Sequence, residues 1–149
     1  MVRESLDANA KNVLVFLTPT NGARVQWRST TGGSEADDPG VSSAQPNHWL
    51  RLIRRGNAFA GLGSSDGQHW VALGSQTVSM GTNVYIGIGQ ATANYSNTDS
   101  NSATYDNYSI QSSTLPSPWL EQNTSSVSTP NLSTFDDNSY IIHTTGQDT

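Results

Sequence analysis

Acidic side chains are the first candidates for chemistry in this 149-residue chain, which has twelve of them. A retaining glycosidase needs two carboxyl groups about 5 Å apart, one acting as acid and the other as nucleophile. The densest acidic group is Glu35, Asp37 and Asp38, and it lies in a stretch rich in Gly and Pro that is typical of a loop. Solvated charge is therefore favoured over catalysis, and we expect no enzymatic activity.

Calcium is the one cofactor that the acidic residues suggest, because it prefers hard oxygen ligands. Two adjacent pairs qualify, although neither has the spacing of an EF-hand loop: Asp37 with Asp38, and Asp136 with Asp137. Polar turns whose side chains cap their own backbone are the favoured alternative. The three histidines are scattered without an HExxH spacing and cysteine is absent, so a zinc site or a thiol nucleophile is not predicted.

Glycan binding requires an aromatic face that stacks on a pyranose ring and polar groups that bridge its hydroxyls. Large aromatics such as Trp27, Trp49 and Trp70 are expected in or near the core. The better surface candidates, with exposed loop residues as the alternative reading, are Tyr95, Tyr105, Tyr108, Asn94 and Asn97.

Four asparagines begin the acceptor pattern for N-glycosylation: Asn94, Asn107, Asn123 and Asn131. In a chain so rich in Asn, Ser and Thr, such matches also arise by chance. They matter only in a host that has the glycosylation machinery.

Charge and hydropathy exclude several partners. The net charge is −5 and the isoelectric point is near 4.8, whereas nucleic-acid binding needs a basic field. No window approaches the roughly 18 apolar residues of a membrane span, so no membrane insertion is expected. Few charged residues and many small hydroxyl and amide side chains are typical of secreted β-rich modules, which predicts an extracellular or cell-surface location.

The elements that must position these residues are short strands. Apolar and polar residues alternate in several segments, the Asp66-Gly67 dipeptide is a strong turn signal, and nothing repeats with helical periodicity. Residues 31–47 are predicted to be a loop. The expected strands occupy residues 1–6, 12–17, 23–30, 49–53, 58–62, 71–80, 84–90 and 103–110, and together they predict an all-β, antiparallel sandwich or jelly roll with little or no helix.

Composition divides the chain into three parts. Residues 1–112 are predicted to form the β-sandwich, residues 113–118 are a Ser/Pro linker, and residues 119–149 form a strand-forming tail. The tail is too short to fold alone but has an apolar set that would be costly to leave in water: Trp119, Phe135, Tyr140, Ile141 and Ile142. It is expected to dock in cis or in trans, or to be part of a longer tandem protein.

The segments WLRLIRRGNAFAGLGSSDGQHW, VYIGIGQATA and ATYDNYSI, with the TPTNG turn before them, resemble the concanavalin A-like lectin/glucanase sandwich domains found in tandem in bacterial secreted proteins. The resemblance covers residues 1 to about 110 and implies a concanavalin-like jelly roll that lacks its usual opening strands. The tail is similar to the opening of a next domain. Glucanases of this superfamily carry an E-x-D-x-x-E arrangement on one strand, which is absent here.

Three functions are therefore weighed. The resemblance favours a non-catalytic extracellular module that binds a polysaccharide or another glycan. The alternative is a structural subunit of a homo-oligomer or filament built by strand donation from residues 119–149, since an added strand satisfies an exposed sheet edge. A glycosidase is the third.

Overall fold

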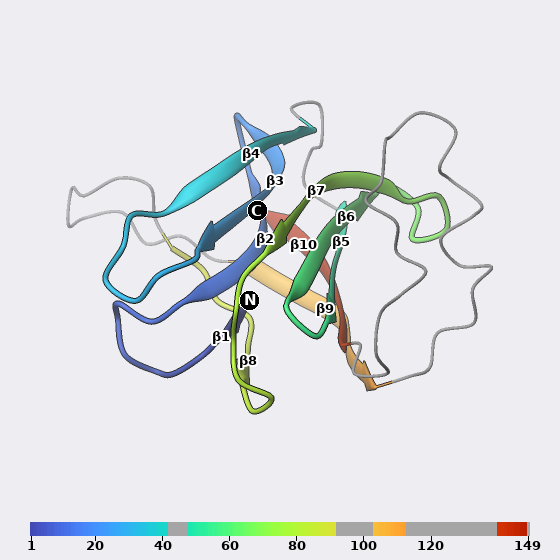
Figure 1. Ribbon diagram of the computed structural model, residues 1–149. Helices are drawn as coiled ribbons and strands as arrows, with labels where there is room; N and C mark the ends of the chain where they lie inside the picture. Colours follow the sequence, from blue (N-terminus) through green and yellow to red (C-terminus); the bar gives the residue numbers. More distant parts are fainter. Residues whose placement is uncertain (42–47, 92–102, 113–139, 149) are drawn as a thin grey trace.

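The computed structural model describes the chain except for residues 42–47, 92–102, 113–139 and 149 (Figure 1). The described strands form two five-stranded antiparallel sheets, sheet A in the order β4-β3-β2-β1-β8 and sheet B in the order β7-β6-β5-β10-β9. Sheet A contains β1 (Val2–Arg3), β2 (Asn12–Thr18), β3 (Gly22–Arg28), β4 (Ala36–Val41) and β8 (Tyr85–Ile86). Sheet B contains β5 (His48–Arg55), β6 (Ala58–Ser64), β7 (Val71–Thr77), β9 (Ala103–Ser112) and β10 (Tyr140–Asp148).

The all-β, antiparallel prediction is confirmed, and the described ranges contain no helix. It follows that no helix among them is long and apolar enough to cross a membrane. The central meander is also confirmed, since β5 pairs with β6 and β6 with β7. Arg55 pairs with Ala58 across a two-residue turn whose first residue, Gly56, has φ 57°, as a type II′ turn requires.

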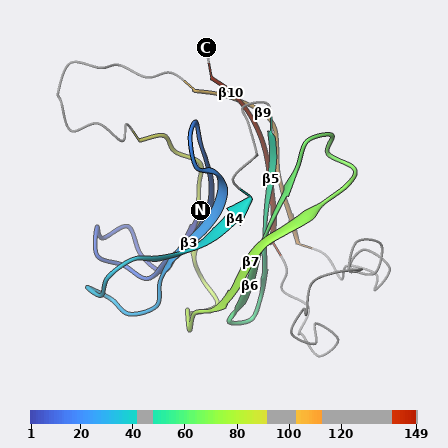
Figure 2. The same cartoon turned by 90° about the horizontal axis from the view of Figure 1, so that it is seen from above.

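The two sheets pack face to face and enclose the core (Figure 2). Val25 of β3 and Leu52 of β5 are both buried to 1% exposure in this core. The sheets approach closely at Gly61 of β6, where a Cβ atom would collide with Val25 Cγ2 and lie 2.6 Å from Val15 Cγ1. The absence of a side chain at Gly61 therefore allows β6 to lie close to Val25 and Val15 of sheet A.

The prediction that residues 31–47 are a loop is wrong for β4, which pairs with β3 at the edge of sheet A. Its Pro39 suits an edge strand, where an N–H group facing away from the sheet needs no partner. Gly40 has φ 59°, and a Cβ there would collide with the Ala23 carbonyl, so the bulge in this pairing needs glycine. Together Pro39 and Gly40 gave this strand the composition of a loop.

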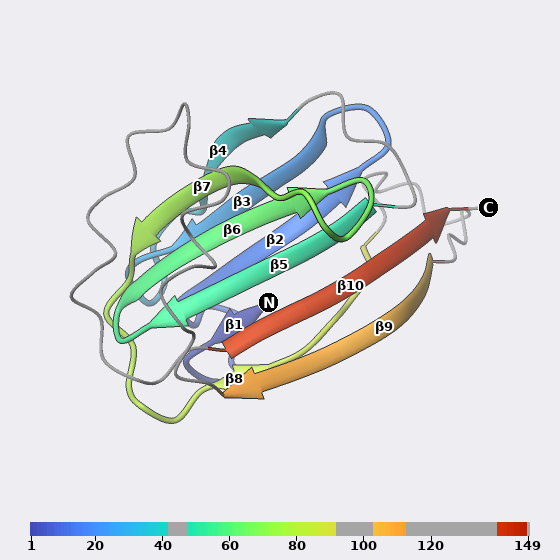
Figure 3. The same cartoon turned by 90° about the vertical axis from the view of Figure 1, so that its right-hand side faces the viewer.

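β10 is an interior strand of sheet B (Figure 3). It pairs with β5 from Ile141↔Ile53 to Gly146↔His48, and with β9 from Tyr140↔Ser112 to Asp148↔Ala103. In this structure the strand-forming part of the tail is thus paired within its own chain. The predicted linker 113–118 and the tail residues Trp119 and Phe135 lie outside the described residues.

The other strand predictions differ from the structure mainly in length. Residues 84–90 contribute only β8, which pairs with β1 over two residues. β9 instead extends to Ser112, past the predicted end at residue 110. Sheet A therefore ends in two very short strands beside the long edge strand of sheet B.

Candidate functional site

β9 carries the described aromatic residues of the predicted glycan site. Ile110 pairs with Ile142, which pairs with the core residue Leu52, so Ile110 lies on the face of sheet B that is turned toward sheet A. Tyr105 lies on the same face by the same register, since it pairs with Gly146, which pairs with His48.

A β-bulge interrupts β9 between these two residues. The register shifts between His143 and Thr145, and Asn107 has φ 51°, a left-handed conformation that asparagine tolerates better than most residues. A bulge bends its strand and changes the direction of the neighbouring side chains. Asn107 and Tyr108 are the two residues of β9 that lie within this bulge, between the pairs Asp106↔Thr145 and Ser109↔His143.

β8 and β9 lie on the same side of the sandwich (Figure 3). Several large side chains remain exposed there. Tyr108 is 42% exposed and Ile110 is 47% exposed, because the two-residue strands β1 and β8 cover little of the inner face of β9. Ile88, just after β8, is 47% exposed. We call Ile88, Tyr105, Tyr108 and Ile110 the β8–β9 surface.

Tyr105 joins the two edges of this surface. Its hydroxyl donates a hydrogen bond of 3.0 Å to the Gly89 carbonyl, three residues past β8. The exposed Asn107 side chain, two residues further along β9, adds a polar group. The arrangement offers apolar and aromatic area next to hydrogen-bonding groups, but no described pair of carboxylates.

Of the residues predicted to bind glycan, the structure therefore brings Tyr105 and Tyr108 to one surface, while Tyr95, Asn94 and Asn97 lie outside the described residues. Among the glycosylation patterns only Asn107 is described, and it is exposed in the β9 bulge. Asn123 and Asn131 also lie outside the described residues.

The predicted calcium ligands have other contacts where they are described. The Asp37 carboxylate forms an ion pair of 2.7 Å with Arg24, and Asp38 packs its carboxylate against Gly74 of β7. Within the described ranges, no three His, Cys, Asp or Glu side chains gather into a group that could hold a metal ion. Asp136 and Asp137 lie outside those ranges, so calcium binding stays a prediction.

Two other acidic residues, Glu35 and Glu4, form ion pairs with nearby basic side chains. Glu35 pairs with Arg28 at 2.8 Å and accepts a hydrogen bond of 3.0 Å from the Asn12 amide. Glu4 pairs with Lys11 at 2.8 Å. These contacts give the acids a role in holding strands and turns together.

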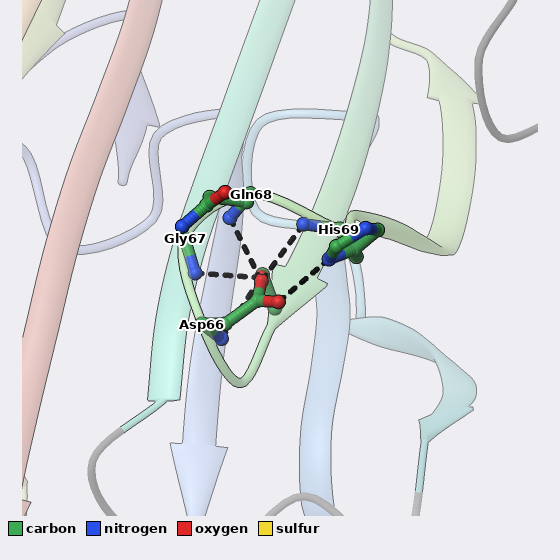
Figure 4. A network of polar contacts seen from close by, with 5 residues as sticks. Asp66, Gly67, Gln68 and His69 are labelled. Atoms are coloured by element: carbon green, nitrogen blue, oxygen red, sulfur yellow. Dashed lines mark hydrogen bonds and ion pairs between the residues drawn. The ribbon is translucent and has the colours of Figure 1, made fainter.

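The turn between β6 and β7 is organised by Asp66 (Figure 4). One carboxylate oxygen accepts hydrogen bonds of 2.8 Å from the backbone N–H groups of Gln68 and His69, and the other lies 2.6 Å from His69 Nδ1. The His69 side chain, followed by the two backbone donors, holds the pKa of Asp66 well below its usual range. This Asp-Gly turn is thus a structural element that fixes the β6–β7 hairpin.

Two of the three arginines of β5, Arg51 and Arg54, are buried parts of the scaffold. The Arg51 guanidinium is stacked 3.8 Å from the centre of the Trp70 ring, and burial lowers the pKa of Arg51 to about 10, so it stays charged at neutral pH. Arg54 donates hydrogen bonds to the carbonyls of Gly56, Met80 and Gly81. The sequence predicted these arginines as interleaved residues of a strand and did not predict their burial.

Ile88 and Ile110 were missed as surface residues. Each belongs to a segment predicted as a strand, and the sequence did not indicate which face it would occupy. Their exposure follows from the shortness of β1 and β8, for which the sequence has no clear signal.

Comparison of the chain with protein families, with curated proteins and with solved structures found no match in any of the three. The function of the chain is therefore inferred from its own residues and contacts.

Proposed function

We propose that this chain is a non-catalytic, concanavalin-like jelly-roll module of an extracellular or cell-surface protein, and that it binds a glycan on the β8–β9 surface. The observation that carries the proposal is the partly exposed Tyr108 ring in the β9 bulge, next to the exposed Asn107 amide. An aromatic ring with adjacent polar groups matches a sugar, which has an apolar ring face and hydroxyls around it.

The placement of the surface on two sheet edges supports an elongated ligand. The Tyr105 hydrogen bond to Gly89 ties β9 to the chain after β8, so the apolar groups of both edges are held at a fixed separation. Preorganised groups bind with a smaller loss of conformational entropy than mobile ones. An oligosaccharide lying along β9 could contact Tyr108 and Ile110 together.

Titration calorimetry with laminarihexaose, cellohexaose, xylohexaose and chitohexaose tests the proposal. An aromatic contact is worth about 0.5–1.5 kcal/mol, so Tyr108→Ala is expected to weaken binding of the recognised sugar about three- to tenfold.

The matched control is Val71→Ala, which removes an exposed apolar side chain from β7, at the other edge of sheet B. It is expected to leave the affinity unchanged. No heat signal with any of the four sugars at millimolar concentration, or an equal loss in both variants, would contradict glycan binding at this surface. Protein produced in a bacterial host avoids a glycan on Asn107.

A further inference from the structure

β10 occupies a slot whose two walls come from distant parts of the chain. One wall is β5 and the other is β9, and β10 is paired with both along its length. Without β10, both walls would expose unpaired backbone N–H and C=O groups, which readily accept another strand. The slot therefore takes a strand that pairs with β5 on one side and with β9 on the other, as β10 does.

The connection into β10 is far longer than the geometry needs. Ser112, the last residue of β9, lies directly opposite Tyr140, the first residue of β10. Two antiparallel strands that meet in this way can be joined by a two-residue turn. Instead, residues 113–139 lie between them, and a fully extended chain of that length spans up to about 90 Å.

We propose that β10 is an exchangeable strand: the β10 of one copy fills the slot between β5 and β9 of a second copy. Exchange preserves every pair that β10 makes in the single chain, because the same residues meet in the same register. Reciprocal exchange closes a two-fold dimer. Donation around a larger set of copies gives a ring or an open filament.

Concentration decides between the single chain and the exchanged form. A connection of a few tens of residues holds its own strand at an effective concentration on the order of a millimolar. In dilute protein, β10 therefore pairs with β5 and β9 of its own chain. Exchange becomes significant where copies are crowded to a similar concentration, as in a dense surface layer.

The absence of cysteine allows a direct test with full-length chains that carry one engineered cysteine each. Thr104 of β9 lies opposite Gln147 of β10. Facing Cα atoms in an antiparallel sheet are about 4.5–5.5 Å apart, within the range that a disulfide bridges. A disulfide between Thr104→Cys in one chain and Gln147→Cys in another therefore reports exchange.

The two single-cysteine proteins are mixed, unfolded, refolded together at about 1 mM or 0.1 mM, and oxidised. Non-reducing electrophoresis and peptide mass spectrometry then identify the 104–147 disulfide. We expect this heterodimer at the higher concentration, and about fivefold less of it among the chains refolded at the lower one, because the intermolecular concentration of β10 falls from about the intramolecular value to about a tenth of it.

Two controls make the result decisive. Val71→Cys mixed with Gln147→Cys places an exposed cysteine on β7, at the other edge of sheet B, and is expected to give at least about tenfold less heterodimer. A single chain with both Thr104→Cys and Gln147→Cys should close an internal disulfide in dilute solution. The proposal is overturned if this chain closes but the mixture stays monomeric at 1 mM, if the Val71 control crosslinks equally, or if the internal disulfide fails to form.

Discussion

Asp66 illustrates how a single exposed residue determines a turn in this protein. Its carboxylate accepts from two consecutive backbone N–H groups and from the Ser64 hydroxyl, and it contacts the His69 ring. Each of these donors favours the charged form of the carboxyl group. The hairpin between β6 and β7 is consequently linked to the protonation of one side chain.

Protonation of Asp66 should lower stability in acid. The folded-state pKa lies well below the usual value of 3.8, so the unfolded chain binds this proton more readily. The contribution of Asp66 is therefore complete above about pH 4 and is lost as the pH falls further toward the folded-state pKa. Asp66→Asn is expected to melt at a lower temperature at pH 7 and to lose less stability than the native chain between about pH 4 and pH 2.

Thermal unfolding followed by circular dichroism across this pH range measures the effect. Asp7→Asn is the control, since Asp7 is an exposed turn residue whose carboxylate accepts from a serine side chain, Ser5, as Asp66 does from Ser64. Parallel pH curves for the native chain and Asp66→Asn would show that the turn does not depend on the ionised carboxylate.

Single residues of this meander were only partly predictable from sequence. The Asp-Gly dipeptide correctly indicated the turn, because few other residues suit Gly67 at φ 73°. The indole that packs against Gly67 belongs to Trp49 of β5, although Trp70 lies much nearer to Gly67 in the sequence. Trp70 contacts Arg51 instead, and such a pairing depends on how β5 and β7 lie in three dimensions.

At the scale of elements, small residues set how closely the sheets approach. β6 places Gly61 opposite Leu52 of β5 and against Val25 of β3. Tight packing of this kind tolerates neither a cavity nor an added methyl group without cost.

Gly61→Ala should therefore destabilise the sandwich. The added Cβ would overlap Val25 and crowd Val15, and overpacking of a filled core costs about 1–3 kcal/mol. Urea unfolding measures the loss. Gly87→Ala is the matched control, because a Cβ there has no atom within 4 Å, and it should change the free energy of unfolding by less than about 0.5 kcal/mol. Equal effects of the two substitutions would refute close packing at Gly61.

Strand existence was better predicted than strand ends. The predicted alternation of apolar and polar residues is seen in β3, where Val25 is buried in the core and Arg24 forms an ion pair with Asp37. β4 escaped prediction because Pro and Gly are turn residues in most contexts, and only the edge position makes Pro39 acceptable. The surface on β9 was predicted through Tyr105 and Tyr108, but its exposure depends on the shortness of strands elsewhere in the chain.

For the whole molecule, β10 joins the edge strand β9 to the β7-β6-β5 meander of sheet B. In chain order, β9 comes after β5, β6 and β7 and before β10. Its described strand partner is β10. Sheet B thus depends on a contact between residues far apart in sequence. Contacts of this type form late and slow the folding of β proteins.

Removing residues 140–149 should disrupt more than the deleted strand. β9 would lose its pairing and β5 would become an edge, so the free energy of unfolding should fall by at least about 3 kcal/mol, since a backbone hydrogen bond contributes about 1 kcal/mol. Size-exclusion chromatography should also show aggregation through the exposed edges.

A full-length chain with residues 140–148 in scrambled order is the comparison, because it keeps length and composition but loses the register. It should be destabilised like the truncated chain. An unchanged denaturation midpoint and a monomeric profile after truncation would mean that β10 contributes nothing to the fold.

Pro39 hinders the addition of a further strand at the β4 edge of sheet A. The edge strand β4 lacks one N–H donor and carries a bulge at Gly40, so a strand arriving from solvent would find an interrupted ladder there. On the opposite side, β9 presents ten residues with a single bulge as its irregularity. Fibrous aggregates of this protein should consequently recruit molecules through the β9 side, and substitutions that improve its solubility should be sought there first.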